Sequence, residues 1–358
     1  MSSAEWYRGV IDGRRRGPLA WATRAALWWA RLPYAVGVGV RNFRYDRNRR
    51  LAGRVPVPVV CVGNLTLGGT GKTVAAEYVA GFYRDLGRQV ALVSRGYGGR
   101  DGGPNDEAMV LEENLPDVPH LQGADRVAVA NAAVEELEAE LIVLDDGFQH
   151  RRLFRDLDVV LLDATRPVTR EYLFPRGVLR EPIGGLRRAG FVLFTRCDQV
   201  PAEELASQRA WLARVFPNLP HATTAHAPVE LVGPDGAEGL DQLAGKSVAV
   251  FSGIGHPPAF VRTVQQLGAT VTAEREFPDH HPYTREDVDD LNRWAASLPA
   301  EVELVLTTQK DWVKLRVGEL GGRKLRAVRV GLKVHEGEEA FQQKLRAVLG
   351  ERFMGVDE

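Results

Sequence analysis

Short apolar runs alternate along the chain with segments whose apolar residues recur at helical spacing. The runs at residues 57–62, 88–94, 141–146, 157–162 and 191–195 are almost continuously apolar, as are parallel strands buried on both faces. Between them, residues 74–83, 106–111, 125–138 and 203–215 have the spacing and charge placement of helices. This alternation predicts an α/β fold with a doubly wound, mostly parallel sheet and ligands at the carboxyl ends of its strands.

The same alternation starts again near residue 226, which predicts a second, smaller α/β domain. Its expected strands are residues 247–251, 270–277, 303–307 and 327–334, with helices ending near 267, starting near 284 and closing the chain. We therefore expect three parts: an arm (1–54), a nucleotide-binding domain (55–225) and a smaller domain (226–358) that closes a cleft.

Composition adds one unusual feature, a strongly basic N-terminus. The chain has 358 residues and a net charge of −1. Residues 1–54 hold twelve arginines against Glu5, Asp12 and Asp46, which gives +9 and leaves −10 for the remainder. Such an end favours an anionic partner. The two cysteines, Cys61 and Cys197, lie in or beside apolar runs and indicate buried thiols in a reducing compartment.

The basic arm also carries Trp6, Trp21, Trp28 and Trp29. On a helix, Trp21, Ala25, Trp28 and Leu32 form one stripe, flanked by Arg24 and Arg31. No uncharged run reaches the roughly 18–20 residues of a membrane span, and no signal peptide is recognisable. We predict an interfacial helix on an anionic membrane surface. A helix packed on the protein's own core remains the alternative, and nucleic acid is not expected because no recognition motif accompanies the charge.

A glycine-rich segment, Gly63-Asn-Leu-Thr-Leu-Gly-Gly-Thr-Gly-Lys-Thr73, joins the first predicted strand to a helix. This is the layout of a P-loop, in which backbone N–H groups surround phosphate oxygens, Lys72 reaches the β/γ-phosphates and Thr73 holds Mg²⁺. The consensus places its first glycine where this chain has Thr66. We predict a P-loop NTPase-like domain that binds a nucleotide.

Paired carboxylates, Asp145 and Asp146, end the predicted strand at residues 141–146. Adjacent carboxylates repel each other unless a cation is present, and P-loop enzymes use such groups on the Mg²⁺ side of the phosphates. Gln149 and His150 follow closely enough to line the same pocket.

Five motifs together resemble the tetraacyldisaccharide 4′-kinase (lipid A 4′-kinase) family, from about residue 20 to 345. They are the P-loop segment, Ser94-Arg-Gly-Tyr-Gly-Gly99, Asp145-Asp-Gly-Phe-Gln-His-Arg151, Phe174-Pro-Arg-Gly-Val-Leu-Arg-Glu-Pro182 and Phe277-Pro-Asp-His280. The resemblance implies transfer of the ATP γ-phosphate to the 4′-hydroxyl of a tetraacyl glucosamine disaccharide 1-phosphate, a step of lipid A biosynthesis. It also implies a monotopic enzyme on the cytoplasmic face of the inner membrane, with no obligate protein partner evident.

The resemblance further assigns expected roles to individual residues. Asp106, paired with His280, is the expected catalytic carboxylate, and His281 is a rival for the histidine. Because these two fall in different predicted domains, we expect the active site in an interdomain cleft. The ATP-binding residues would be Thr66, Leu67, Gly68, Gly69, Thr70, Gly71, Lys72 and Thr73, with Lys72 also catalytic. The Mg²⁺ ligands would be Thr73, Asp145, Asp146 and Glu181. The candidates for phosphate or substrate contacts are Arg95, Gln149, His150, Arg176 and Arg180, each of which has an ordinary structural role as its alternative.

Two departures from the family pattern leave the roles of His256 and Gln309 open. Three further functions also stay open on the sequence. A membrane-associated ATPase switch with a deviant P-loop would need a signature lysine where this chain has Leu67. A non-enzymatic membrane adaptor and a small-metabolite kinase are the second and the third.

Overall fold

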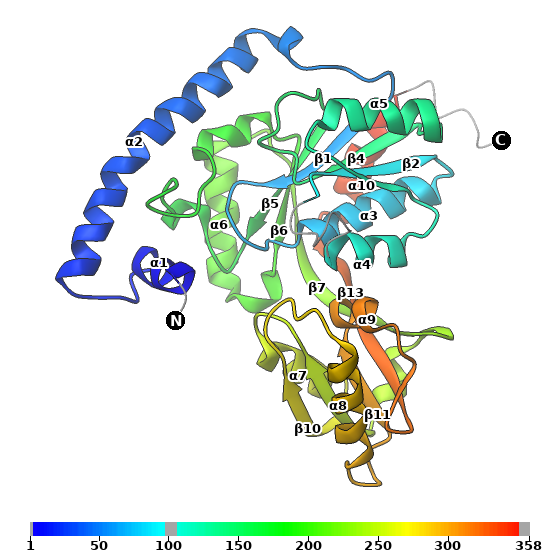
Figure 1. Ribbon diagram of the computed structural model, residues 1–358. Coiled ribbons are helices and arrows are strands. Elements are labelled where there is room, and N and C mark those ends of the chain that lie inside the picture. The colour runs from blue at the N-terminus through cyan, green and yellow to red at the C-terminus, as the bar shows by residue number, and fades with distance from the viewer. Residues whose placement is uncertain (1–2, 97–105, 351–358) are drawn as a thin grey trace. The chain divides into compact units, whose positions relative to one another are not determined.

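The computed structural model describes residues 3–96 and 106–350, which group into two compact units (Figure 1). The larger unit consists of Met1–Arg95, Val118–Ala225 and Lys333–Glu358, and the smaller unit of Gly96–Asp117 and His226–Leu332. Residues 97–99 of the Ser94–Gly99 motif lie outside the described residues. Each unit is an α/β structure, as the apolar pattern predicts.

A parallel sheet forms the centre of the larger unit, in the order β7-β6-β5-β1-β4-β2-β3. Every residue of β1, β2, β4 and β6 is buried, which explains why these strands are continuously apolar in sequence. The strands are β1 (Val59–Asn64), β2 (Val90–Ser94), β3 (His120–Gln122), β4 (Leu141–Asp145), β5 (Leu157–Asp163), β6 (Phe191–Thr195) and the start of β7 (His221–Gly233).

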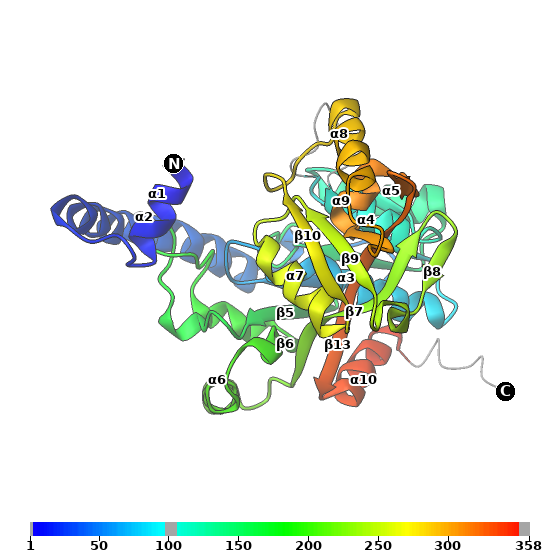
Figure 2. The same ribbon diagram turned by 90° about the horizontal axis from the view of Figure 1, so that it is seen from below.

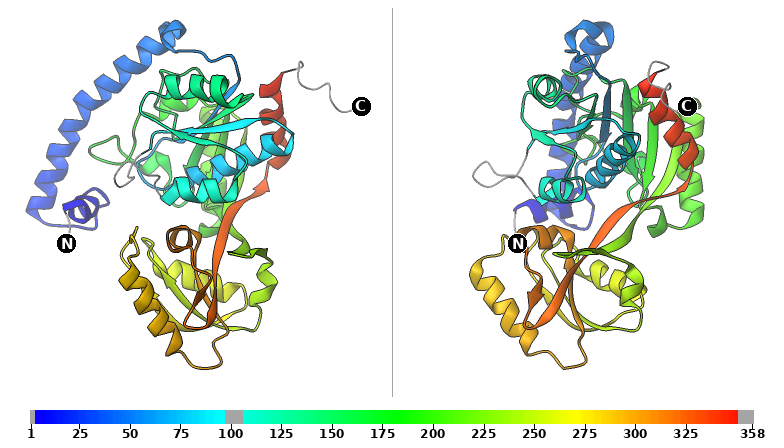
Figure 3. Two further views of the ribbon diagram at one scale, coloured as in Figure 1. Left: turned by 45° about the vertical axis from the view of Figure 1, so that its right-hand side comes forward. Right: turned by 90° about the vertical axis from the view of Figure 1, so that its right-hand side faces the viewer.

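Helices cover both faces of this sheet. One face is covered by α3 (Lys72–Asp85) and α10 (Glu338–Leu349), which lie side by side (Figure 3). They are joined by the Tyr83 hydroxyl, which donates to the Leu345 carbonyl at 2.7 Å, and by stacked rings of Tyr78 and Phe341. On the other face, α5 (Arg126–Leu137) and α6 (Ala202–Val215) contribute to one apolar cluster with β1, β4, β5 and β6. The fold is therefore the expected doubly wound three-layer arrangement.

In the smaller unit the strands pair in parallel in the order β10-β9-β11-β13. Helix α7 packs on one face, while α8, α9 and α4 share an apolar cluster on the other. The strands are β8 (Gly236–Glu238), β9 (Ser247–Ser252), β10 (Thr270–Glu276), β11 (Leu304–Thr308), β12 (Glu319–Leu320) and β13 (Arg323–Glu336), of which β8 and β12 are antiparallel to β7 and β13. The helices are α4 (Asp106–Asn114), α7 (Pro257–Gln266), α8 (Arg285–Ala296) and α9 (Gln309–Leu315).

Short 3₁₀ helices occur in the connecting segments. They are Arg49–Leu51, Val168–Arg170, Ile183–Arg188, Cys197–Gln199 and Leu240–Leu243.

Helix α4 belongs to the smaller unit, although the sequence pattern assigned its residues to the nucleotide-binding domain. Met109 and Val110 pack against the cluster that contains α8 and α9. Asn114 and Gln309 exchange amide hydrogen bonds of 3.3 and 2.5 Å. These contacts explain why α4 belongs to the smaller unit. Conversely, residues from 333 onward group with the larger unit, because α10 packs on α3.

The N-terminal arm consists of α1 (Ser3–Ile11) and α2 (Pro18–Arg47), which lie close together where they meet (Figure 2). Arg24 of α2 donates to the Arg15 carbonyl at 2.9 Å. Along α2 only Ala20 and Val38 are buried, whereas Trp21 and Trp29 are 70% and 67% exposed. Little of α2 is therefore packed on the rest of its unit. Among the described helices, none combines the length and apolarity that a membrane crossing requires.

We predict that the stability of the larger unit falls on mild acidification because the partly buried His120 is held in its neutral form. Its Nε2 lies 2.9 Å from the Ser94 hydroxyl, and burial lowers the His120 pKa from 6.5 to about 4. Between those two values the unfolded chain binds the extra proton, so folding stability decreases as pH falls through this window.

The test is thermal unfolding of wild type and His120→Gln across that pH range. The melting temperature of the variant should decrease less on acidification than that of wild type, whatever the stability of the variant at neutral pH. Parallel curves for the two proteins would contradict the assignment.

Candidate active-site residues in the two units

The loop between β1 and α3 is open to a ligand on its glycine-rich side. Gly68 and Gly71 have φ angles of +109° and +87°, a left-handed conformation that other residues rarely adopt. A Cβ placed on Gly68 or Gly69 would meet no atom within 4 Å. The start of the loop is held firmly, since the Leu67 N–H donates to the Val178 carbonyl at 2.7 Å. Asn64 Nδ2 also donates to Thr70 Oγ1 at 2.8 Å. The backbone therefore has the open, anchored form of a phosphate-binding loop.

Positive charge gathers where α3 begins. The helix starts at Lys72, its first turn has no acidic residue, and Thr73 is its second residue. The unpaired N–H groups and the dipole of such an end attract anions. Lys72 Nζ lies 3.8 Å from Asp146 Oδ1. This pairing keeps the ammonium beside the end of β4, within the larger unit.

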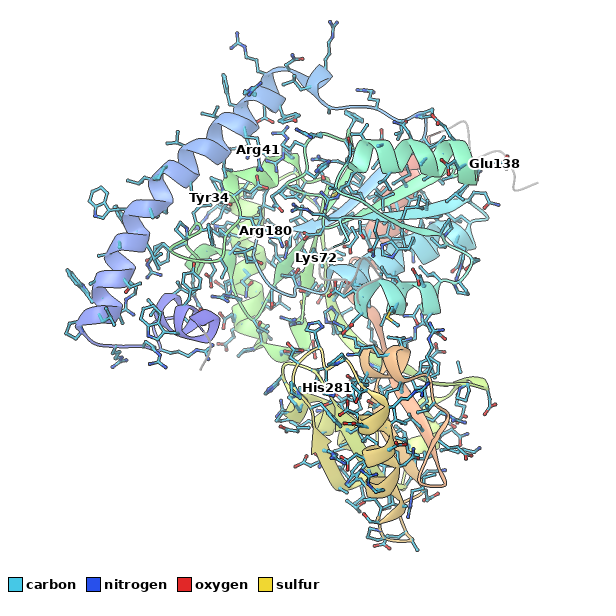
Figure 4. The ribbon with its side chains drawn as sticks, viewed as in Figure 1. Tyr34, Arg41, Lys72, Glu138, Arg180 and His281 are labelled. Carbon is cyan, nitrogen blue, oxygen red and sulfur yellow. The ribbon has the colours of Figure 1, made fainter. Side chains whose placement is uncertain are left out.

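Asp145 and Asp146 follow β4, which runs parallel to β1 with Val62 opposite Asp145. Their carboxylates therefore lie at the same edge of the sheet as the P-loop. Asp146 has a φ of +49° and accepts from Arg180 Nη1 at 2.8 and 3.0 Å. In Figure 4, Tyr34, Arg180 and Lys72 follow one another from α2 toward the P-loop. The structure thus brings Lys72, Asp146 and Arg180 together.

Glu181, predicted as a Mg²⁺ ligand, is buried and hydrogen-bonded to other side chains in this structure. It is fully buried, and both of its oxygens accept hydrogen bonds from Arg188 Nη2, at 3.0 and 2.9 Å. Asn42 Nδ2 and Gln149 Nε2 each donate to it at 3.0 Å. Gln149 also donates to the Asn64 carbonyl at 2.8 Å. Glu181 therefore links α2 to the end of β1.

The donor set of the larger unit fits a nucleotide phosphate with Mg²⁺. The open glycine backbone and Lys72 suit phosphate oxygens, and the Thr73 hydroxyl with Asp145 and Asp146 supplies the oxygen donors that Mg²⁺ prefers. Within the described residues, no group of three or more His, Cys, Asp or Glu side chains has the arrangement of a metal site. Magnesium in P-loops is held by few side chains and by the phosphates themselves, so two carboxylates and a hydroxyl are compatible with it.

A basic pocket of about 690 Å³ lies in the larger unit beside α2. Three of the predicted contact residues, Arg95, Gln149 and His150, line it. The other basic residues on its walls are Arg41, Arg44, Arg126, Arg151 and Arg152. None of the described lining residues is acidic. Burial, with the nearby arginines, lowers the His150 pKa to about 4, so this histidine is neutral at pH 7. The pocket can therefore hold an anion.

Arg176 lies apart from this pocket. It donates to the Ile11 carbonyl at 3.2 Å and its guanidinium lies 4.5 Å from the Tyr172 ring. Arg176 therefore holds α1 in place, which corresponds to the structural alternative.

The smaller unit holds Asp106 and His280 in direct contact. Asp106 begins α4, and its Oδ2 lies 3.0 Å from His280 Nδ1. His280 has a left-handed φ of +57°, and its N–H donates to the Gly253 carbonyl at 3.0 Å. Its side chain is 62% exposed and that of Asp106 is 20% exposed. Hydrogen bonds from His280 and Lys314 outweigh desolvation and lower the Asp106 pKa, so the carboxylate stays ionised. The geometry pairs these two residues inside one unit.

The rival histidine has another partner. His281 Nε2 lies 3.0 Å from Asp287 Oδ2, and its ring packs on Phe277. His256 precedes α7, and its Nε2 lies 3.4 Å from Arg262 Nη2. Gln309 pairs with Asn114, as described above, so it stabilises the contact of α9 with α4.

Several residues that contribute to these arrangements carried no sequence signal. Arg188 and Asn42 bind Glu181, and Arg126 lines the basic pocket. Arg196 Nη2 donates to the Gly69 carbonyl at 2.6 Å while Nη1 binds Asp163, so it supports the P-loop. An isolated arginine or asparagine looks the same in sequence whether it is buried or solvated, and only the fold separates the two.

The parallel sheet, the P-loop and the carboxylates after β4 define a P-loop nucleotide-binding α/β protein. A family model described as tetraacyldisaccharide-1-P 4′-kinase matches residues 23–350. The chain belongs to this family.

Individual relatives agree with that assignment. The chain is 40% identical over 369 residues to a tetraacyldisaccharide 4′-kinase of Anaeromyxobacter dehalogenans, which covers 96% of this chain and 95% of the relative. It is 38% identical to one of Syntrophus aciditrophicus, with 79% and 82% covered. Among solved structures, LpxK from Aquifex aeolicus in complex with ATP is similar, with a TM-score of 0.72 and 29% identity over 91% of this chain and 99% of that one.

We predict that Gly63→Ala, at the end of β1, destabilises the larger unit. An added Cβ would lie 2.6 Å from Phe148 Cβ and 2.9 Å from its backbone nitrogen, and Phe148 is fully buried. Overpacking of this kind costs about 2 kcal/mol. Urea unfolding should give this loss, whereas Gly69→Ala in the same loop, where the Cβ meets open space, should be nearly neutral. Equal stability of the two variants would contradict the prediction.

Proposed function

We propose that this chain transfers the γ-phosphate of ATP to the 4′-hydroxyl of a tetraacyl glucosamine disaccharide 1-phosphate. The observation that carries the proposal is the match to the tetraacyldisaccharide-1-P 4′-kinase family over residues 23–350, which includes the P-loop and the Asp106–His280 pair. The relatives bear the name of this activity, and the similar LpxK structure was determined with ATP. The product would be the 4′-phosphorylated lipid precursor of lipid A.

Residues of the larger unit bind the nucleotide in this proposal. The backbone from Thr66 to Thr73 surrounds the phosphates and Lys72 contacts the β/γ-phosphates. Thr73, Asp145 and Asp146 would hold Mg²⁺, which would supply charge neutralisation on the phosphates. Arg180 orients Asp146 through the contacts at 2.8 and 3.0 Å. Lys72 exchanges its pairing with Asp146 for the phosphates when the nucleotide enters.

Asp106 of the smaller unit accepts the proton of the attacking hydroxyl. Its carboxylate is ionised, and the hydrogen bond to His280 fixes its orientation. A positioned carboxylate of this kind aligns the nucleophile and removes its proton as the new O–P bond forms.

The basic pocket binds the anionic end of the acceptor. Six arginines line a pocket without acidic walls among the described residues, and Arg126 is only 6% exposed. Burial lowers the pKa of Arg126, which means that its charge is incompletely solvated. A phosphate monoester would restore the lost solvation through bidentate guanidinium contacts. We assign the 1-phosphate to this pocket.

The arm places the enzyme on the lipid that contains its acceptor. Helix α2 exposes Trp21, Trp29, Val36 and Phe43. The Arg31 guanidinium lies 4.3 Å from the Trp28 ring. Aromatic rings at headgroup depth with arginines on lipid phosphates are typical of interfacial helices. We propose peripheral binding to the cytoplasmic face of the inner membrane.

The transfer reaction tests the proposed activity directly. Purified protein, Mg²⁺ and ATP labelled in its γ-phosphate are incubated with the detergent-dispersed acylated disaccharide 1-phosphate. Label should enter the lipid, and an acceptor whose 4′-hydroxyl is methylated should remain unlabelled. Lys72→Met should lower the rate about a hundredfold or more, because it removes a charge that stabilises the transition state.

Two outcomes of this experiment would overturn the proposal. ATP hydrolysis at the same rate with and without lipid, and no label in the lipid, would instead favour the ATPase switch. Label transfer to the methylated acceptor would contradict the assigned hydroxyl.

Membrane binding is tested with Trp21→Ser/Trp29→Ser. Burial of a large side chain contributes about 1.5–3 kcal/mol, so losing two should lower binding to anionic liposomes by about tenfold or more. The Michaelis constant for ATP in detergent should stay the same. Val229→Ser, a similarly exposed apolar residue on β7, serves as the control. Unchanged liposome binding by the double variant would assign the arm a role other than membrane contact.

A further inference from the structure

Helix α9 carries two lysines one turn apart, and each faces an acidic residue in the first turn of α4. Lys310 Nζ lies 3.7 Å from Glu107, and Lys314 Nζ lies 3.1 Å from Asp106 Oδ2. The two pairs differ in burial: the side chain of Lys310 is 46% exposed, whereas that of Lys314 is 9% exposed. A solvent-exposed ion pair contributes little to stability, whereas the charge of a buried lysine interacts strongly with the groups around it.

The ammonium group of Lys314 has a defined direction. Besides Asp106, it donates to the His281 carbonyl at 3.0 Å and lies 3.7 Å from Asp311 Oδ1. The ring of Tyr283 lies 5.4 Å from it. An ammonium has three N–H donors, so these partners match its capacity. Lys314 is therefore a fixed donor and not a mobile surface charge.

Asp311, one of these partners of Lys314, is itself fully buried and hydrogen-bonded. Asp311 Oδ2 accepts from the Thr308 hydroxyl at 2.6 Å and from the Gly253 N–H at 3.1 Å. The Gly253 carbonyl in turn accepts from the His280 N–H at 3.0 Å. One connected set of hydrogen bonds thus positions both Lys314 and His280.

Lys314 and His280 contact the same oxygen of Asp106. His280 Nδ1 lies 3.0 Å and Lys314 Nζ 3.1 Å from Oδ2. Two donors on one oxygen fix the plane of the carboxylate, and neither of them occupies Oδ1. Oδ1 is then the oxygen to which a hydroxyl can donate.

We propose that Lys314 is a positioning residue for phosphoryl transfer, which holds Asp106 ionised and directs its Oδ1 toward the attacking hydroxyl. This inference rests on the function proposed above. In the step, the hydroxyl proton moves to Asp106 Oδ1, the sugar oxygen bonds to the γ-phosphorus, and the bond from the γ-phosphorus to the bridging oxygen of ADP breaks. Lys314 keeps its proton throughout.

The charges around Asp106 agree with this role. Desolvation alone would raise the Asp106 pKa, but the hydrogen bond from His280 and the charge and hydrogen bond of Lys314 lower it overall. The other titratable groups nearby are Glu107 on α4, Lys310 and Asp311 on α9, and Asp279, His281, Tyr283 and Asp287 around the His280 loop. After the hydrogen bond of His280, the charge and the hydrogen bond of Lys314 are the next contributions that oppose desolvation. Without it, the Asp106 pKa rises and the carboxylate protonates at higher pH.

The experiment compares Lys314→Met, Lys314→Arg and the control Lys310→Met with wild type in the lipid phosphorylation assay. Lys314→Met should lower kcat about tenfold or more, with the Michaelis constant for ATP within about twofold, because the loss falls on the proton-transfer step. The acidic limb of the pH profile of kcat should move to higher pH in this variant, because the Asp106 pKa rises when the charge and hydrogen bond of Lys314 are lost. Lys314→Arg keeps the charge and should recover most of kcat. Lys310→Met should behave as wild type.

Circular dichroism and thermal unfolding exclude a folding defect, and Asp106→Ala gives the reference for full loss of the carboxylate, about 10²–10⁴-fold. A folded Lys314→Met enzyme with wild-type kcat and pH profile would overturn the inference, as would an Arg variant no better than Met. If wild type itself transfers no phosphate to the lipid, the proposed function fails instead. If wild type is active and Asp106→Ala is equally active, the role of Asp106 fails and Lys314 has nothing to position.

Discussion

A fully buried carboxylate must be compensated by nearby donors, and the larger unit is organised around one such group, Glu181. Its partners are Arg188, Asn42 and Gln149, which come from three separate parts of the chain. Removal of Arg188, the only one of these three partners that carries a charge, would leave the buried charge without its counter-ion, at a cost of a few kcal/mol. Through Gln149 the same group reaches the carbonyl of Asn64, where β1 turns into the P-loop. The start of the P-loop is therefore linked through Gln149 to a buried charge.

The smaller unit uses the same physical device. Asp311 is buried at the start of α9, and its oxygens are directed by Thr308, Gly253 and Lys314. The Gly253 carbonyl accepts a hydrogen bond from the His280 N–H, and Lys314 donates one to the side chain of Asp106. In both units the candidate site residues lie at the edge of a hydrogen-bond network whose centre is a buried carboxylate. Such networks favour a single arrangement of side chains over several of similar energy.

The apolar pattern predicts the sheet well because a strand buried on both faces has to be apolar at every position. The strands β1, β4 and β6 are examples, and the P-loop follows from its glycines and the Lys72-Thr73 pair. The same reasoning missed the long strand β7, whose sequence mixes polar and apolar residues, and β3, which is short and only partly buried. It also missed β8 and β12, which pair antiparallel with β7 and β13. Family membership also came from the sequence, because the motifs are long and occur in order.

The sequence could not assign α4 to its unit, because the partners of α4 lie some two hundred residues away on α9. A nine-residue helix with two acids at its start is compatible with either location. Glu181 presented the same difficulty: an acidic residue after an arginine suits a metal ligand as well as a buried anchor. Its burial and its three donors appear only once α2, Gln149 and Arg188 come together. Pairwise contacts between distant segments are the information that composition and periodicity do not contain.

Arg180 connects the N-terminal arm to the P-loop and to Asp146. Its main-chain carbonyl accepts a hydrogen bond from the Tyr34 hydroxyl of α2 at 2.8 Å. Its N–H donates to the Leu65 carbonyl at 2.7 Å, and its guanidinium donates to the Asp146 carboxylate. A single amino acid is thus shared by the tryptophan-rich helix, the root of the glycine loop and the carboxylate beside Lys72. A shift of that helix would therefore act on the start of the P-loop and on Asp146 through the same residue. One residue therefore couples the position of α2 to the positions of the P-loop and of Asp146.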